Sequence, residues 1–205
     1  MKGKVWPGEC NFPDYTDPKV RDWWAGLFKE IISEIGINGI WNDMNEPAVM
    51  EVPGKTFPMD VRHDYDGNPC SHRKAHNIYG TQMARATYEG VKQFAYPKRP
   101  FIITRSAYSG AQRYTSSWTG DNVASWDHLN IANIQAQRMC MSGFSFIGSD
   151  IGGFAEQPNG ELYARWIQLG IFHPFCRTHS SGDHGNQEPW TFDKTVTDVV
   201  RKFIE

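Results

Sequence analysis

The sequence has little cysteine, no long apolar run and almost no net charge. Its four cysteines, Cys10, Cys70, Cys140 and Cys176, form no C-x-x-C pair, which argues against a zinc knuckle or a disulfide-stapled scaffold. We expect most of them to be reduced residues of the core. No run reaches membrane-spanning length, and the first residues lack the apolar core of a signal peptide. A net charge of -2 gives no electrostatic reason to expect a nucleic acid or an anionic membrane as partner.

The sequence does contain many aromatic residues, 14% of the chain including eight tryptophans. Flat apolar side chains of this kind occur in sugar sites and also in large cores. With 205 residues the chain is long enough for one sizeable core. We find no internal repeat, no low-complexity segment and no second domain.

One stretch organises the chain. The apolar run Ile37–Trp41 ends abruptly in two amides, two acidic residues and a proline within residues 42–47. A strand buried on both faces has such a continuous apolar run, and α/β barrels place catalytic groups where strands end. A carboxylate at Asp43, between Trp41 and Met44, suits work on a sugar ring.

The acidic residues also have local structural interpretations. Asp43 or Asn45 fits the cap of a helix that has Pro47 in its first turn. Asp121 fits the cap of the helix that follows it. Local chemistry alone leaves these alternatives open.

The predicted elements alternate between helix and strand, in the order of an α/β protein. Helices are predicted from Asp17-Pro18 to Gly36, and at His76–Phe94, Ala124–Met141, Gly160–Leu169 and Thr195–Ile204. Strands are predicted at Ile37–Trp41, Phe101–Arg105, Tyr114–Trp118, Phe144–Asp150 and Ile171–Phe175. Residues 44–72 form a long excursion with a turn at Asp64–Asn68. Inward faces are predicted for Val20, Trp23, Trp24, Leu27, Ile31 and Ile35, for Trp126, Leu129, Ile134 and Met139, and for Val196, Val199, Val200 and Phe203.

The five predicted strands share one property, a charged or polar group at the C-terminal end. These groups are Asp43, Arg105, Asp121, Asp150, and Arg177 with His179. An α/β barrel with its site on the C-terminal face gives this pattern. Asp43 and Asp121 follow different strands, so both can reach one pocket. Hydrolysis of a glycosidic bond needs two such carboxyl groups, one ionised and one protonated.

Five motifs now resemble those of glycoside hydrolase family 31, in the order and spacing of its α-glucosidases. They are Trp41-Asn42-Asp43-Met44-Asn45-Glu46-Pro47, Thr104-Arg105-Ser106, Trp118-Thr119-Gly120-Asp121-Asn122, Gly148-Ser149-Asp150-Ile151-Gly152-Gly153-Phe154 and Arg177-Thr178-His179. The segments His72–Gly80 and Gln187–Trp190 extend the match over nearly the whole chain.

The resemblance implies that Asp43 is the nucleophile and Asp121 the general acid/base of a retaining mechanism, with the two carboxyl groups about 5–6 Å apart. Glu46 would support the nucleophile. The remaining residues implied for the first sugar subsite are Trp41, Met44, Arg105, Trp118, Asp150, Phe154 and His179. The family implies no metal and no cofactor.

The chain departs from the family in extent. The resemblance implies an incomplete (β/α)8 TIM barrel, of which residues 1–205 form one partial domain holding about strands 4–8. The first three strands and a sugar-binding aspartate of the family have no counterpart here. We therefore expect an excised piece whose partners are an oligosaccharide substrate and the remainder of the parent catalytic chain. We expect the isolated piece either to self-associate along its open sheet edges or to persist as an open half-barrel, and to have little or no activity.

Alternatives on the same scaffold are an α-xylosidase, an α-transglucosidase and an α-glucan lyase. A non-catalytic carbohydrate-binding fragment is the alternative from another class. The presence of both carboxylates favours a catalyst over a binding module.

Overall fold

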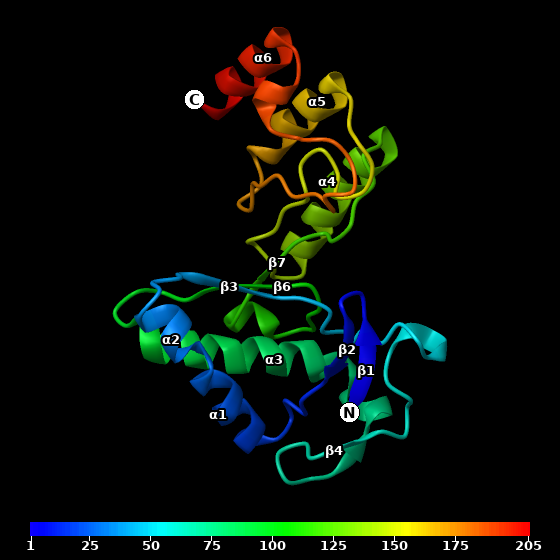
Figure 1. The fold of residues 1–205 in the computed structure, drawn as a ribbon, viewed down its shortest axis with the longest axis vertical. Coiled ribbons are helices and arrows are strands. Elements are labelled where there is room, and N and C mark those ends of the chain that lie inside the picture. The colour runs from blue at the N-terminus through cyan, green and yellow to red at the C-terminus, as the bar shows by residue number, and fades with distance from the viewer. The chain divides into compact units, whose positions relative to one another are not determined.

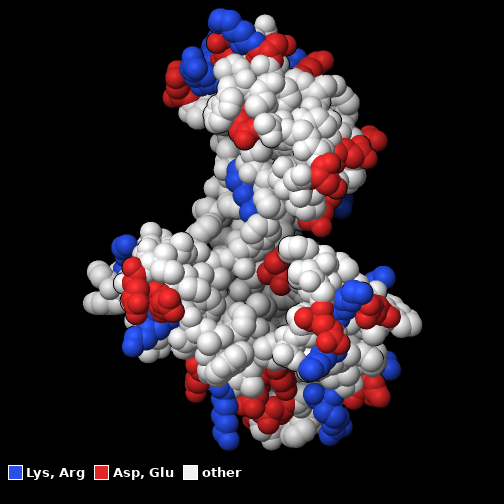
Figure 2. Space-filling model, viewed as in Figure 1, with Lys and Arg blue, Asp and Glu red and all other residues white.

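The structure is a computed structural model that describes residues 1–205, and the chain forms two compact units, Met1–Ser116 and Ser117–Glu205. Each unit is described by itself. On the face in Figure 2, lysine and arginine side chains are interspersed with acidic ones rather than gathered in one broad patch. None of the helices combines the length and the apolar composition needed to cross a bilayer.

The first unit is built around a long helix and a pair of parallel strands (Figure 1). Its helices are α1 (Pro18–Gly26), α2 (Phe28–Ser33) and α3 (His72–Ala95). Its strands are β1 (Lys2–Val5), β2 (Gly8–Asn11), β3 (Gly39–Asn42), β4 (Arg62–His63), β5 (Cys70–Ser71) and β6 (Phe101–Thr104). Strands β3 and β6 pair in parallel, with Asn42 opposite Thr104. Helix α3 packs against both strands and against α1 and α2. The register therefore places the residues that follow β3 and β6 next to each other.

The first predicted helix is divided in two. Asp17 caps α1 as predicted, since its carboxylate accepts a hydrogen bond from the Lys19 amide at 2.8 Å. The helix then breaks at Leu27, and α2 buries Phe28 and Ile32. The predicted inward face is wrong for four of its six residues, since Trp23, Leu27, Ile31 and Ile35 are exposed.

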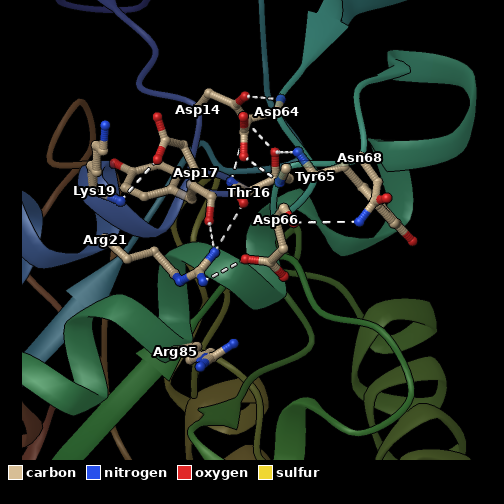
Figure 3. A network of polar contacts seen from close by, with 12 residues as sticks. Asp14, Thr16, Asp17, Lys19, Arg21, Asp64, Tyr65, Asp66, Asn68 and Arg85 are labelled. Carbon is tan, nitrogen blue, oxygen red and sulfur yellow. Dashed lines mark hydrogen bonds and ion pairs between the residues drawn. The ribbon is translucent and has the colours of Figure 1, made fainter.

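The excursion after β3 is tied to the segment that precedes α1 (Figure 3). The Asp14 carboxylate accepts a hydrogen bond from the Asp64 amide at 2.7 Å. The buried Arg21 guanidinium binds the Asp66 carboxylate at 2.7 Å. The predicted turn at Asp64–Asn68 is confirmed, with three consecutive residues of positive φ.

The second unit contains α4 (Trp126–Met141), α5 (Gly160–Gly170) and α6 (Lys194–Ile204). Its core surrounds α5, where Trp166 has no exposed surface and its indole nitrogen donates to the Ser149 hydroxyl at 2.9 Å. Helix α6 adds Val196 and Val200 to this core, as predicted, whereas Phe203 is exposed.

Two predicted strands of the second unit are not regular strands. Neither Phe144–Asp150 nor Ile171–Phe175 is a strand, and the isolated parallel bridge nearby joins Asp150 to Arg177, two residues beyond the second segment. The predicted strand Tyr114–Trp118 shortens to β7 (Ser116–Ser117), at the border of the units. A contact distant in the sequence accompanies this irregular geometry: a Cβ on Gly148 would lie 1.8 Å from the Phe175 carbonyl oxygen.

Two further sequence predictions fail in the second unit. Helix α4 buries Ala132 and Ala136, while Trp126 and Ile134 are exposed. The two alanines allow this helix to pack closely. Hydrophobic periodicity points to large apolar residues and so does not reveal this buried face. The four cysteines are free, as predicted, but none is fully buried: Cys10 packs against the core of the first unit, Cys70 is half-buried, and Cys140 and Cys176 are exposed.

Candidate active site

Asp43 directly follows β3 at the start of a tight turn. Residues 45–47 form the turn, in which the Ala48 amide donates to the Met44 carbonyl at 2.9 Å. Met44 has φ +57°, a left-handed conformation that is uncommon outside glycine. No helix begins here. The capping interpretation of Asp43 and Asn45 is therefore wrong, and the Asp43 carboxylate is not used to cap a helix.

Arg105 directly follows β6 and lies beside two carboxylates of the turn. Its Nη1 is 3.5 Å from Asp43 Oδ1, and its Nε donates to Glu46 Oε1 at 2.8 Å. Its Nη2 lies 3.4 Å from Glu46 Oε2, so the contact with Glu46 uses both carboxylate oxygens. One cation shared by two acids offsets the repulsion between them. Glu46 is therefore linked to Asp43 through Arg105, and its supporting role stays a prediction.

The apolar residues predicted for this half of the site differ in exposure. Trp41 is 37% exposed, so part of its indole surface is open. Met44 is partly buried and packs against the apolar cluster that contains Tyr15 and Tyr79.

Asp150 forms the polar centre of the second unit and is fully buried. Its Oδ1 accepts two hydrogen bonds from Arg177, from Nη2 at 2.9 Å and from Nε at 3.2 Å. Burial raises the pKa of Asp150 to about 6, although Arg177 acts in the opposite direction. The Arg177 guanidinium also lies over the Trp118 ring, 5.4 Å from its centroid. Trp118, Asp150 and Arg177 therefore form one packed cluster.

Asp121 is exposed in the second unit, and its charge contributes to the raised pKa of Asp150. The cap of α4 is Ser125, whose hydroxyl accepts from the His128 amide at 3.2 Å. The capping interpretation of Asp121 is therefore wrong as well.

The rings of Phe154 and His179 pack against each other in a tilted arrangement, with their centroids 5.3 Å apart. His179 also lines a cavity of about 460 Å³ together with Tyr163, His184 and Glu188. Such an arrangement presents one aromatic face and several hydrogen-bonding groups on one side of the unit.

The structure thus brings the predicted residues together in two groups, one in each unit. The predicted separation of the Asp43 and Asp121 carboxyl groups stays a prediction. Sequence reasoning omitted Arg177 and Asn45 from the site. Arg177 had a detectable signal, since it lies two residues before His179 in the same motif.

Residues 1–205 match the family model described as "Glycosyl hydrolases family 31 TIM-barrel domain". The chain belongs to glycoside hydrolase family 31. This confirms the resemblance seen in the sequence motifs and assigns the chain to a barrel-forming family.

Among family members, the chain is 46% identical over 202 residues to Alpha-glucosidase 2 of Bacillus thermoamyloliquefaciens, which covers 98% of this chain and 25% of that protein. It is 41% identical over 203 residues to human Neutral alpha-glucosidase AB, which covers 98% of this chain and 21% of that protein. The chain thus spans about a quarter of the length of these relatives.

Two solved structures of the family are also similar. The glucosidase II alpha subunit with alpha3-Glc2 bound gives a TM-score of 0.92 at 36% identity, covering 100% of this chain and 22% of that one. A Family 31 alpha-glucosidase from Bacteroides thetaiotaomicron gives 0.86 at 42% identity, covering 99% and 32%.

Proposed function

We propose that this chain is the acid-bearing part, about strands 4–8, of the (β/α)8 barrel of a retaining α-glucosidase. The complete enzyme would release terminal α-linked glucose from oligosaccharides through a covalent glycosyl-enzyme intermediate. The proposal is supported above all by the contact of Arg105 with Asp43 and Glu46 at adjacent strand ends, in a family whose similar members are named α-glucosidases.

In the proposed mechanism, Asp43 attacks C1 of the sugar while Asp121 protonates the glycosidic oxygen of the leaving group. Asp121 then removes a proton from water, and the resulting nucleophile displaces the sugar from Asp43. Retention follows because each of the two steps inverts C1. The remaining proposed contacts with the first sugar ring come from Trp41, Met44, Arg105, Trp118, Asp150, Phe154 and His179.

The nucleophile is tested by trapping in the complete enzyme that carries these residues. A 5-fluoroglycosyl fluoride is expected to label Asp43, and peptide mass spectrometry identifies the labelled residue. Asp64→Asn, in the excursion, serves as a control that keeps the labelling, whereas Asp43→Asn abolishes it. A label on Glu46 or no label at all would contradict the assignment.

The general acid is tested by the dependence on the leaving group. An Asp121→Ala enzyme is expected to lose more activity on maltose than on p-nitrophenyl α-glucoside, because p-nitrophenolate departs without a proton. Equal losses on both substrates would contradict a role as general acid.

The alternatives differ in substrate or product. An α-xylosidase would prefer p-nitrophenyl α-xyloside, a transglucosidase would lengthen its substrate, and a lyase would release sugar without adding water. A carbohydrate-binding fragment would bind glucose oligosaccharides, yet Asp43→Asn would change nothing measurable.

We also propose that the isolated chain has little or no activity, and that it either self-associates or persists as an open half-barrel with exposed apolar surface, because a partial barrel leaves strand edges unpaired. Gel filtration and an apolar dye check the second point. A monomer that binds no dye, or clear turnover of p-nitrophenyl α-glucoside by the isolated chain, would contradict the proposal.

A further inference from the structure

The turn that presents Asp43 is fastened by the side chain of Asn45. Its Nδ2 donates to the Thr104 hydroxyl at 2.8 Å, and its Oδ1 accepts from the Ser106 amide at 3.1 Å. Asn45 is only 2% exposed, and Thr104 is the last residue of β6. Both hydrogen-bonding groups of the amide therefore bind the end of the neighbouring strand.

Thr104 closes this arrangement into a ring. Its hydroxyl accepts from Asn45 and donates to the Ser106 carbonyl at 3.0 Å. The Thr104 side chain is fully buried, so water does not replace either bond. A serine at this position would keep both bonds, whereas a valine of nearly the same shape would remove both.

The ring holds both partners of the proposed catalytic contact. Arg105 lies between Thr104 and Ser106 in the chain, and its amide donates to the Asn42 carbonyl at 3.0 Å. On the other side, Asn45 lies between the strained Met44 and Glu46. Left-handed backbone outside glycine persists where its surroundings fix it. The Asn45 ring supplies this constraint for the segment that begins at Asp43.

Helix α3 supports the ring closely through Gly80. A Cβ at this position would lie 2.6 Å from the Ser106 carbonyl oxygen and 2.8 Å from the Asn45 carbonyl oxygen. Only glycine permits this approach of the helix to both turns. The two turns are therefore held against a rigid element, as a preorganised site requires.

We infer that Asn45 is a positioning residue that, through Thr104, sets the direction of Asp43 toward the sugar carbon. The inference rests on the proposed function, because it presupposes that Asp43 attacks. A displacement of about 1 Å at a reacting group costs about 100-fold in rate. The effect belongs to kcat, since Asn45 and Thr104 themselves bind no substrate.

The chain offers a matched control for the test. Thr87 on α3 is also fully buried and also accepts from an asparagine of the same motif, Asn42 Nδ2, at 3.1 Å. It further accepts from the Trp24 indole at 2.9 Å. Thr87→Val therefore removes comparable bonds behind β3 rather than beside Asp43.

The experiment measures kcat, KM and melting temperature in the complete enzyme with p-nitrophenyl α-glucoside. Thr104→Val is expected to lower kcat about 10- to 100-fold with KM within about threefold. Thr104→Ser should stay within about threefold of the unmodified enzyme, because it keeps the hydroxyl. Thr87→Val should lower the melting temperature as much as Thr104→Val and leave kcat within about threefold.

Equal kcat values for Thr104→Val and Thr87→Val, or a change in KM alone, would overturn the inference and leave the proposed function intact. If Thr104→Val does not fold, Thr104→Ala gives the same test, because it also removes the hydroxyl and adds no charge beside Asp43. An unchanged kcat for Thr104→Ala would also overturn the inference. An unmodified enzyme with neither turnover nor label on Asp43 would instead reject the proposed function, and this inference with it.

Discussion

Acid is expected to destabilise the first unit through a buried pair of histidines. His63 and His72 are 3% and 0% exposed. His63 Nδ1 lies 2.9 Å from Asp14 Oδ1, and His63 Nε2 lies 2.9 Å from His72 Nδ1. The Thr56 hydroxyl lies 3.4 Å from His72 Nε2. Only one proton fits between the two rings, so His63 Nε2 and His72 Nδ1 do not both carry a proton in this contact.

The pKa of His72 reflects this environment. Burial, together with the nearby His63 and His76, lowers it to about 4. Burial alone would raise the pKa of Asp14, but hydrogen bonds from His63, Asp64 and Thr16 lower it to about 2. The carboxylate therefore stays ionised and available to His63 throughout the range in which His72 titrates.

The sign of the pH effect follows from the depressed pKa of His72. An unfolded histidine has a pKa of about 6.5, so the unfolded chain binds more protons than the folded chain between about pH 6.5 and pH 4. The stabilisation is complete above this range and is lost as the pH falls through it. Between pH 7 and pH 5 the free energy of unfolding is expected to fall by about 2 kcal/mol through His72.

Urea unfolding of the chain at both pH values, followed by tryptophan fluorescence, measures this loss. His72→Asn places an amide where Nδ1 lies and removes the titrating group. It should therefore reduce the pH-dependent loss by about 2 kcal/mol. His184→Asn, in the second unit, should leave the loss unchanged. If His72→Asn loses as much stability between pH 7 and pH 5 as the unmodified chain, the reasoning is refuted.

Two further predictions concern the second unit, and thermal unfolding measures both. Ser125→Ala should cost about 1 kcal/mol because it removes the cap of α4, whereas Asp121→Ala should change stability by less than about 0.5 kcal/mol; the reverse order would restore the capping interpretation. Gly148→Ala should cost about 3 kcal/mol or more, because its Cβ would meet the Phe175 carbonyl, while Gly26→Ala in open space should cost nothing. An unchanged melting temperature for Gly148→Ala would contradict this close contact.

The elements that the sequence predicted well have strong local signals. Strands β3 and β6 are short runs that a charged residue follows directly. Helix α5 begins at Gly160, directly after its capping residue Asn159. The elements predicted poorly depend on distant neighbours. The segment that ends at Phe175 passes so close to Gly148 that regular pairing is lost, and nothing local to either segment indicates this contact.

The same holds for the candidate site: some of its residues can be predicted from the sequence around them, and others depend on contacts that are distant in the sequence. The roles proposed for Asp43, Asp121 and Arg105 can be predicted from the sequence, because the proposed chemistry restricts which side chains can serve it. Their partners are less detectable, because Arg177 binds a carboxylate 27 positions away and Asn45 binds a hydroxyl 59 positions away. The parallel register of β3 and β6, rather than any local pattern, makes the second contact.

The two asparagines that flank Asp43 illustrate why register decides function. Asn42 and Asn45 belong to one motif, are both buried, and each donates through Nδ2 to a buried threonine hydroxyl. Asn42 is the last residue of β3, so its bond reaches Thr87 on the helix behind the sheet. Asn45 lies past the turn, so its bond reaches Thr104 at the neighbouring strand end. The same residue type therefore anchors the strand at one position and aims the carboxylate at the other, because a three-residue shift across a strand end changes which element the amide meets.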